Sequence, residues 1–178
     1  MFNPFRKQSR VRDQVVEQIP RLRRYARALT GSTVAAEDLL QESLAHALER
    51  LDQWQPDTDL RAWLFTVMHN LHISEHRRSG RQPELYPLES LAEPLLSVAD
   101  AEQDQRLAEL ERALQQLTVE QREVLLLVTL EGMPYRTVAQ VLNIAEGTVM
   151  SRLHRAREQL RNELAREPKT GRMLRRVK

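Results

Sequence analysis

The segment from Thr148 to Arg157 carries short polar and cationic side chains at helical spacing, a pattern that suits contact with duplex DNA. At about 100° per residue, one face of residues 148–166 is an apolar stripe: Val149, Leu153, Ala156, Leu160 and Leu164. The opposite face holds Ser151, His154, Arg155 and Glu158, with Met150 at its flank. Such a helix can present its N-terminal residues to base edges while the buried stripe anchors it.

Two arginines of the same segment predict affinity for DNA without sequence readout. Arg152 and Arg157 can extend toward phosphates, which attract cations whatever the base sequence. Together with Thr148 they complete the predicted DNA-binding set of this helix. The alternative is a surface helix with a merely solvated charged face. DNA binding is favoured because a short helix, a tight turn and a cationic helix follow one another from Tyr135 onward.

A second candidate site is the predicted helix 60–78. Its core stripe is Leu60, Trp63, Leu64, Val67, Met68 and Leu71. The far face carries Phe65, His69, His72 and His76, with Asn70 at the flank and Arg77 and Arg78 at the end. Bases stack on aromatic rings while cations follow phosphates, so this face predicts binding of single-stranded DNA.

The histidines of this helix leave two other interpretations open. His72 and His76 are four residues apart and could chelate zinc together, with His69 nearby. No acidic or fourth ligand is evident beside them, so no metal site is predicted. The face could also be an ordinary solvated surface.

The predicted helix 35–54 has an acidic face. Leu40, Leu44, Ala47, Leu48 and Leu51 form its expected core stripe. Asp38, Glu42 and Glu49 lie opposite, beside an expected exposed Leu39 and His46. An acidic face does not favour DNA, but acids around an exposed leucine can dock on a protein. In isolation, a solvated acidic face is the simpler interpretation.

The elements that position these residues predict an all-α fold of two small helical domains joined by a linker. The first domain (8–80) contains helices near 11–29, 35–54 and 60–78, with a break or kink expected at Pro20. The second (104–166) opens with a leucine-bearing helix and a capping box at Thr118–Gln121. A helix-turn-helix of winged-helix-like type follows, with Asn143 at the turn.

Charge is distributed unevenly along the 178 residues, although the net charge is only +2. The linker 81–103 contains three prolines and an excess of acids, and the tail 167–178 is basic. Cysteine is absent, which fits a reducing cytoplasm. No apolar stretch approaches the ~20 residues of a membrane span, and the basic N-terminus lacks the apolar core of a secretory signal. We therefore expect a cytoplasmic protein without membrane insertion.

Taken together, these segments resemble the extracytoplasmic-function (ECF) class of the sigma-70 family. The resemblance rests on residues 36–42, 60–65 with 69–71, 117–124 and, above all, 147–157, and it extends over about residues 10–165. It implies sigma region 2 in the first domain and sigma region 4 in the second. The implied protein is no enzyme and needs no cofactor.

The resemblance also implies partners. Asp38, Leu39, Gln41 and Glu42 would dock on the clamp helices of the polymerase β′ subunit, and the β subunit would complete the core-polymerase interface. The helix from Leu60 and the loop before it would open the minus-ten promoter element and capture a flipped base. The last helix would read the minus-thirty-five element, and an anti-sigma factor would hold the protein inactive.

Two residues depart from the family pattern, and one alternative function stays open. Met150 stands where many relatives have arginine or lysine, so contact there would be apolar, for instance with a thymine methyl group. His154 has an uncertain charge at neutral pH. A sigma-like decoy that binds an anti-sigma factor without reading DNA is the alternative, but such a decoy need not keep Asn70, Ser151 and Arg155.

Overall fold

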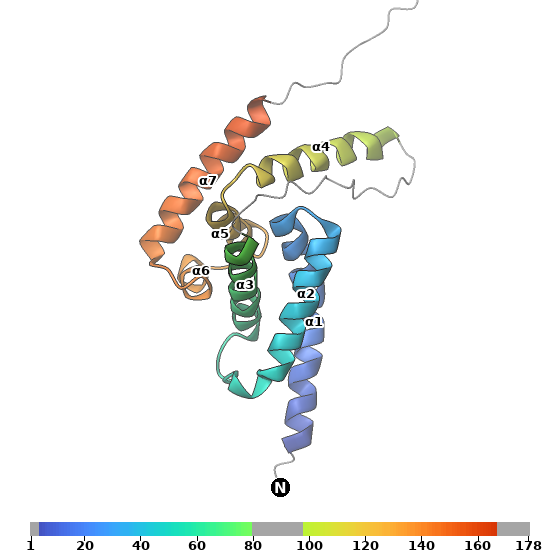
Figure 1. The fold of residues 1–178 in the computed structure, drawn as a ribbon, viewed down its shortest axis with the longest axis vertical. Helices are drawn as coiled ribbons and strands as arrows, with labels where there is room; N and C mark the ends of the chain where they lie inside the picture. Colours follow the sequence, from blue (N-terminus) through green and yellow to red (C-terminus); the bar gives the residue numbers. More distant parts are fainter. Residues whose placement is uncertain (1–3, 80–97, 167–178) are drawn as a thin grey trace, which may run out of the picture.

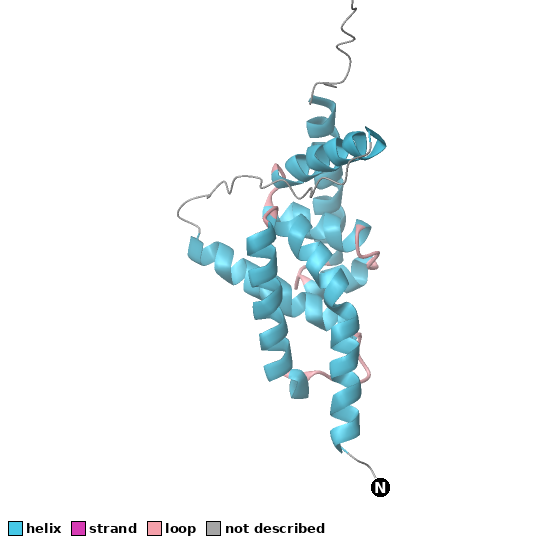
Figure 2. Ribbon diagram, turned by 90° about the vertical axis from the view of Figure 1, so that its right-hand side faces the viewer, coloured by secondary structure: helices cyan, strands magenta, loops and turns pink. Residues whose placement is uncertain are grey.

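The computed structural model describes residues 4–79 and 98–166, and within them every regular element is helical (Figures 1 and 2). The first module consists of α1 (Pro4–Thr30), α2 (Thr33–Glu49), the short 3₁₀ helix η1 (Leu51–Gln53) and α3 (Leu60–Ser79). The second module consists of α4 (Val98–Gln115), α5 (Val119–Thr129), α6 (Tyr135–Val141) and α7 (Glu146–Arg166). The predicted all-α class is confirmed.

Two predicted segments lie wholly or mostly outside the described residues. The basic tail 167–178 is one, and most of the acidic linker 81–103 is the other. Helix α4 begins at Val98, so it extends into the stretch that the sequence assigned to the linker. None of the described helices combines the length and apolarity that a membrane span requires.

Local signals in the sequence explain where the helices begin. The hydroxyl of Ser32 accepts a hydrogen bond from the Ala35 amide at 3.3 Å and caps α2. The Asp59 carboxylate does the same for α3, accepting from the Arg61 amide at 2.9 Å. The predicted capping box at Thr118 and Gln121 is present in full at the start of α5.

Helix ends and turns also follow the sequence. Gly31 ends α1 with a φ of +70°, a conformation that a residue without Cβ adopts readily. Asn143 begins the turn between α6 and α7 at a φ of +50°, as predicted. This turn sets the direction in which α7 leaves α6, and it therefore positions the predicted DNA-reading helix.

The break expected at Pro20 is absent, because α1 continues through this residue to Thr30. A proline inside a helix leaves the carbonyl of residue i−4 without its amide donor. That carbonyl belongs to Val16. This residue is 61% exposed, and Pro20 is exposed as well. Water can therefore satisfy the freed carbonyl, while Leu22 and Tyr25 keep the next turns buried in the core.

The two modules share one hydrophobic core. Helix α2 packs between α1 and α3, and α7 packs on α5 and α6. Across the boundary, α3 lies against α6, and α1 lies against α5 and α4 (Figure 1). Buried residues of both modules form a single continuous cluster. The candidate sites of the two modules are consequently held in one packed body.

Candidate nucleic-acid and polymerase interfaces

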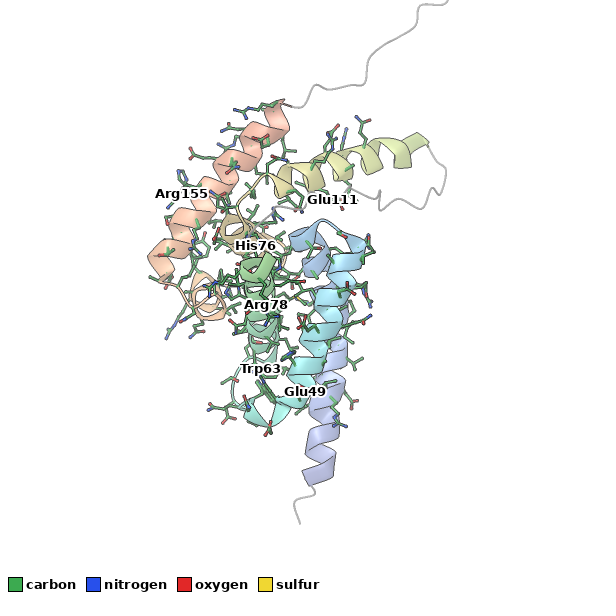
Figure 3. All side chains as sticks on the ribbon, in the orientation of Figure 1. Glu49, Trp63, His76, Arg78, Glu111 and Arg155 are labelled. Atoms are coloured by element: carbon green, nitrogen blue, oxygen red, sulfur yellow. The ribbon has the colours of Figure 1, made fainter. Side chains whose placement is uncertain are left out.

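Helix α7 places the predicted DNA-reading residues on its outer surface. Val149, Leu153 and Ala156 are almost fully buried and anchor the helix. Met150 is 49% exposed, and Arg155 points away from the body (Figure 3). The last apolar residue of the predicted stripe, Leu164, is exposed instead of buried, because α7 extends beyond the helices that cover it.

The remaining predicted residues of α7 lie beside this outer face. His154 and Arg157 are exposed, whereas Thr148, Ser151 and Arg152 are half-buried. The Ser151 hydroxyl donates to the Thr148 carbonyl at 3.1 Å, and His154 Nε2 lies 3.4 Å from a carboxylate oxygen of Glu158. All seven predicted side chains thus gather in the first three turns of one helix.

The acidic face of α2 is only partly as expected. Asp38, Gln41 and Glu42 are exposed. Leu39 is 2% exposed, so the expectation of an exposed leucine is wrong. Because α2 packs between α1 and α3, it buries a wider arc than one stripe, and Leu39 and Leu40 both enter the core. Conversely, Leu48 was expected in the core and is 47% exposed.

The expected exposure of Phe65 on α3 is also wrong. It was expected on the exposed face, but it is 1% exposed and packs edge-on against Tyr25 of α1, with ring centroids 5.0 Å apart. Helix α3 contacts both α1 and α2, so its buried arc extends past the predicted stripe. In this packing the ring cannot stack on a base.

The other predicted minus-ten residues divide into two groups. Asn70, His76, Arg77 and Arg78 are exposed, the last three in the C-terminal turns of α3 (Figure 3). His69 is turned toward the second module, where its Nδ1 lies 2.8 Å from Glu123 Oε1. The second module therefore covers part of the face that the sequence assigned to single-stranded DNA.

His72 lies in the same covered region. Burial, and to a smaller extent the nearby His76, Arg122 and His69, lowers the pKa of His72 from 6.5 to about 4. Its ring stacks on that of His76 with centroids 6.4 Å apart. Among the described residues no group of three or more His, Asp or Glu side chains could hold a metal ion. This result gives the alternative of a zinc site no support.

The contacts between the modules include polar residues that the sequence analysis missed. Arg122 of α5 is buried and donates to the Leu29 carbonyl of α1 at 2.6 Å. Arg24 of α1 and Arg61 of α3 contact the side chain and the carbonyl of Glu131, respectively. One feature of the sequence could have indicated that α5 is covered by both modules: residues 124–128 are apolar without a break, which predicts a helix buried on all sides. The sequence could not show which arginine contacts which acid or carbonyl group.

A pocket opens between α1 and the loop that leads into α3. It has a volume of about 340 Å³, and Gln18, Trp54, Asp59 and Leu60 are among its lining residues. Within the described residues, the indole N–H of Trp54 and the amide oxygen of Gln18 are buried without a hydrogen-bond partner. An aromatic face and unsatisfied polar groups are features that suit a planar, hydrogen-bonding ligand.

Both modules of this chain are similar to known proteins. Residues 15–69 match the family described as the Sigma2 domain of PhyR, and residues 107–160 match Sigma-70, region 4. The ECF RNA polymerase sigma factor EcfG of Rhodopseudomonas palustris is 38% identical over 84% of this chain and 82% of its own length. The ECF sigma factor SigL of Mycobacterium tuberculosis is 38% identical over 78% of this chain and 79% of its own length.

Solved structures show the same packing of the helices. The sigma factor RpoE of Bartonella quintana, in complex with the anti-sigma factor NepR, superposes with a TM-score of 0.73. The two chains are 29% identical, and the match covers 89% of this chain and 98% of RpoE. The helix-turn-helix, the two matched regions and the relatives that are 38% identical lead to one assignment: the chain belongs to the ECF family of RNA polymerase sigma factors.

Proposed function

We propose that this chain binds core RNA polymerase in the cytoplasm and directs it to promoters through three separate surfaces. The observation that carries the proposal is the geometry of α7. A buried stripe fixes the helix, and Met150, His154 and Arg155 project outward from its N-terminal half. A helix that is anchored on one side and polar on the other can lie in a major groove.

The minus-thirty-five element is the proposed target of α7. Arg155 is exposed and can donate two hydrogen bonds to a guanine edge. We expect Arg155→Ala to weaken initiation at the preferred promoter by about 1–3 kcal/mol and to relax selectivity at one position. The measurement is in vitro transcription with core polymerase on a set of promoter variants. The control is Arg12→Ala, an exposed arginine on α1 far from α7 in sequence. Unchanged selectivity in Arg155→Ala would remove this residue from the readout.

The proposed minus-ten surface combines the end of α3 with the pocket at its beginning. Asn70, His76, Arg77 and Arg78 are exposed and can contact a melted strand. The pocket beside Trp54 can receive one flipped base, because an aromatic ring supports stacking and the Gln18 amide can bond a base edge. Phe65 is left out of this surface, since its ring lies in the core.

The proposed polymerase surface is the exposed acidic part of α2. Asp38, Gln41 and Glu42 fit a basic partner such as the β′ clamp helices, with further contacts to the β subunit. Replacing Asp38 and Glu42 together with lysine should reduce binding to core polymerase without unfolding the chain. The same double replacement with lysine at two exposed acids of α1, Asp13 and Glu17, serves as the control. Binding at wild-type strength in the double variant would refute this surface.

Control by an anti-sigma factor belongs to the same proposal. Its support is the superposition on RpoE of Bartonella quintana, whose structure contains the anti-sigma factor NepR. A similar anti-sigma partner that binds this chain should suppress transcription in the reconstituted reaction.

A decoy function is the second candidate, favoured by the match of residues 15–69 to the Sigma2 domain of PhyR. A decoy would bind an anti-sigma factor and give no transcription. The presence of exposed Asn70, His154 and Arg155 supports the promoter-reading function instead. Transcription by core polymerase plus this chain separates the two, because only a sigma factor produces new transcripts.

A further inference from the structure

The outward face of α7 contains one large apolar side chain among polar ones. Met150 is 49% exposed, whereas the other methionines of the described residues, Met68 and Met133, are buried in the core. About one turn further along α7, His154 and Arg155 are exposed as well. An apolar group thus lies within the surface that is proposed to read the minus-thirty-five element.

The position of Met150 is fixed by its neighbours on α7. Val149 and Leu153 are almost fully buried, so the backbone around Met150 is anchored in the core. Helix α7 begins at Glu146, which places Met150 in its second turn. Side chains near the N-terminus of a recognition helix are the ones that reach base edges. The thioether of Met150 is therefore held at the end of α7 that would enter the groove.

The fold does not require the glycine at position 147, three residues before Met150. Gly31 and Gly132 have positive φ values, which favour glycine, but Gly147 does not. Apart from its two neighbours and its own helix backbone, a Cβ on Gly147 would meet no atom of the described residues within 4 Å. Alanine is the better helix former at such a position. The physical reason that is left for glycine is the close approach of a ligand to the backbone.

Gly147 and Met150 lie together on the surface of α7. Residues three apart are neighbours on a helix, and long helical side chains lean toward the preceding turn. Met150 is therefore expected to cover the surface beside Gly147, where no side chain limits how near a base can come. We call Gly147 and Met150 the apolar slot.

The major groove offers one apolar group to such a slot. Base edges there present hydrogen-bond donors, hydrogen-bond acceptors and the C5 methyl group of thymine. A methionine side chain has no donor and gains most by burying apolar surface. A 5-methylcytosine carries the same methyl group at the same ring position. The chemistry that fits the slot is consequently the 5-methyl group of a pyrimidine.

We propose that the apolar slot reads the 5-methyl group of a pyrimidine in the minus-thirty-five element: Met150 contacts the methyl group, and Gly147 lets the base come close. The inference rests on the proposed function, because α7 must lie in the major groove of the promoter. It also has a regulatory consequence. A cytosine at this position is recognised better when it is methylated, so methylation of the promoter strengthens initiation.

Replacing thymine with deoxyuracil removes only the methyl group and therefore tests Met150. With core polymerase, deoxyuracil throughout the minus-thirty-five element should lower initiation by the wild-type chain about fourfold, which is ~0.8 kcal/mol for one methyl group at ~1.4 kcal/mol per tenfold. Met150→Gln should initiate equally from both templates, whereas Met150→Leu should still prefer thymine. Leu164→Ala removes a similarly exposed apolar side chain near the other end of α7 and should keep the wild-type preference.

A second pair of templates distinguishes 5-methylcytosine from thymine. Both carry cytosine at the thymine position with the largest effect, one with the 5-methyl group and one without it. The wild-type chain should initiate about fourfold more strongly from the methylated template, and Met150→Gln should not distinguish the two. A preference for thymine over deoxyuracil without a preference for methylated cytosine would overturn the regulatory consequence.

Gly147→Ala separates a role in binding from a role in folding. Because alanine favours a helix and the new Cβ has open space, the urea midpoint of unfolding should equal or exceed the wild-type value. Initiation from the preferred promoter should nevertheless fall at least about fourfold, since the added methyl group occupies the path of the base. A lower midpoint, or initiation at the wild-type level, would overturn the role given to Gly147.

The outcomes distinguish the apolar slot from the proposed function. If no template gives new initiation, the proposed function and the slot fall together. Normal initiation that is insensitive to the methyl group would overturn the slot alone. A methyl preference that persists in Met150→Gln would assign the contact to another residue and would likewise overturn the slot.

Discussion

Replacing Arg122 with methionine should destabilise the chain far more than replacing an exposed arginine. The Arg122 guanidinium donates to the carbonyls of Leu29, Gln115 and Leu117 at 2.6, 3.0 and 3.1 Å, and also to the Gln115 side chain. Burial lowers the pKa of Arg122 to about 10, partly offset by Glu123, so the group remains charged at neutral pH. Methionine keeps most of the apolar stem but leaves three carbonyls without their donor.

The magnitude follows from these three acceptors. A buried acceptor that loses its partner costs about 1 kcal/mol or more, so the expected loss is about 3 kcal/mol. With a urea m-value of roughly 2 kcal/mol per molar, the unfolding midpoint should fall by ~1.5 M. The control, Arg161→Met on exposed α7, should change the free energy of unfolding by less than ~0.5 kcal/mol. A loss below 1 kcal/mol for Arg122→Met would contradict the role given to these bonds.

The assay can also test whether Arg122 couples the modules. Both tryptophans, Trp54 and Trp63, belong to the first module, so their fluorescence reports that module alone. Circular dichroism reports all helices. In the wild type the two transitions should coincide, since one core spans both modules. In Arg122→Met they should separate, because the bond to the Leu29 carbonyl crosses the boundary.

Three further predictions concern single residues. Because the pKa of His72 is lowered in the packed state, the neutral form of this side chain is favoured there. Its contribution to the free energy of unfolding should be fully present above pH 6.5 and should be lost as the pH falls toward 4. The loss should be about 3 kcal/mol at most, at ~1.4 kcal/mol per pKa unit. In His72→Gln the urea midpoints measured across that range should depend less on pH, and an unchanged pH profile would contradict the burial argument. The neighbouring side chains of His69, His76, Arg122 and Glu123 are kept in the variant. Phe65→Ala should lower the free energy of unfolding by about 3–5 kcal/mol, because the ring lies in the core. A variant that keeps wild-type stability but no longer melts promoters would instead indicate that Phe65 stacks on a base. Gly31→Ala should cost about 1–2 kcal/mol in the same assay, because φ is +70° and the new Cβ would lie 2.6 Å from Gln115 Cδ; a neutral effect would show that the turn relaxes.

Local features of the structure could be predicted because they depend on neighbouring residues. The Thr118 capping box, the Gly31 terminus and the turn at Asn143 each need only a few consecutive residues. The outward face of α7 was also predictable, because this helix is covered on one side only. One apolar stripe then separates buried from exposed positions correctly for Val149 and Arg155.

Features that depend on packing between distant helices could not be predicted. Leu39 and Phe65 were assigned to exposed faces because a helical wheel assumes one buried stripe, whereas α2 and α3 are each covered by more than one helix. The contact between Arg24 and Glu131 joins residues 107 positions apart, and no local pattern pairs them. The sequence therefore predicted most of the helices but not how α1 and α3 pack against α5 and α6.

The measurement that tests the central claim most directly is mapping of transcription start sites on genomic DNA fragments with core polymerase, in the presence and absence of this chain. A promoter-specificity subunit should create a set of new start sites that share sequence elements near minus ten and minus thirty-five, and Arg155→Ala should alter the second element. Start sites that are identical with and without the chain would contradict the account.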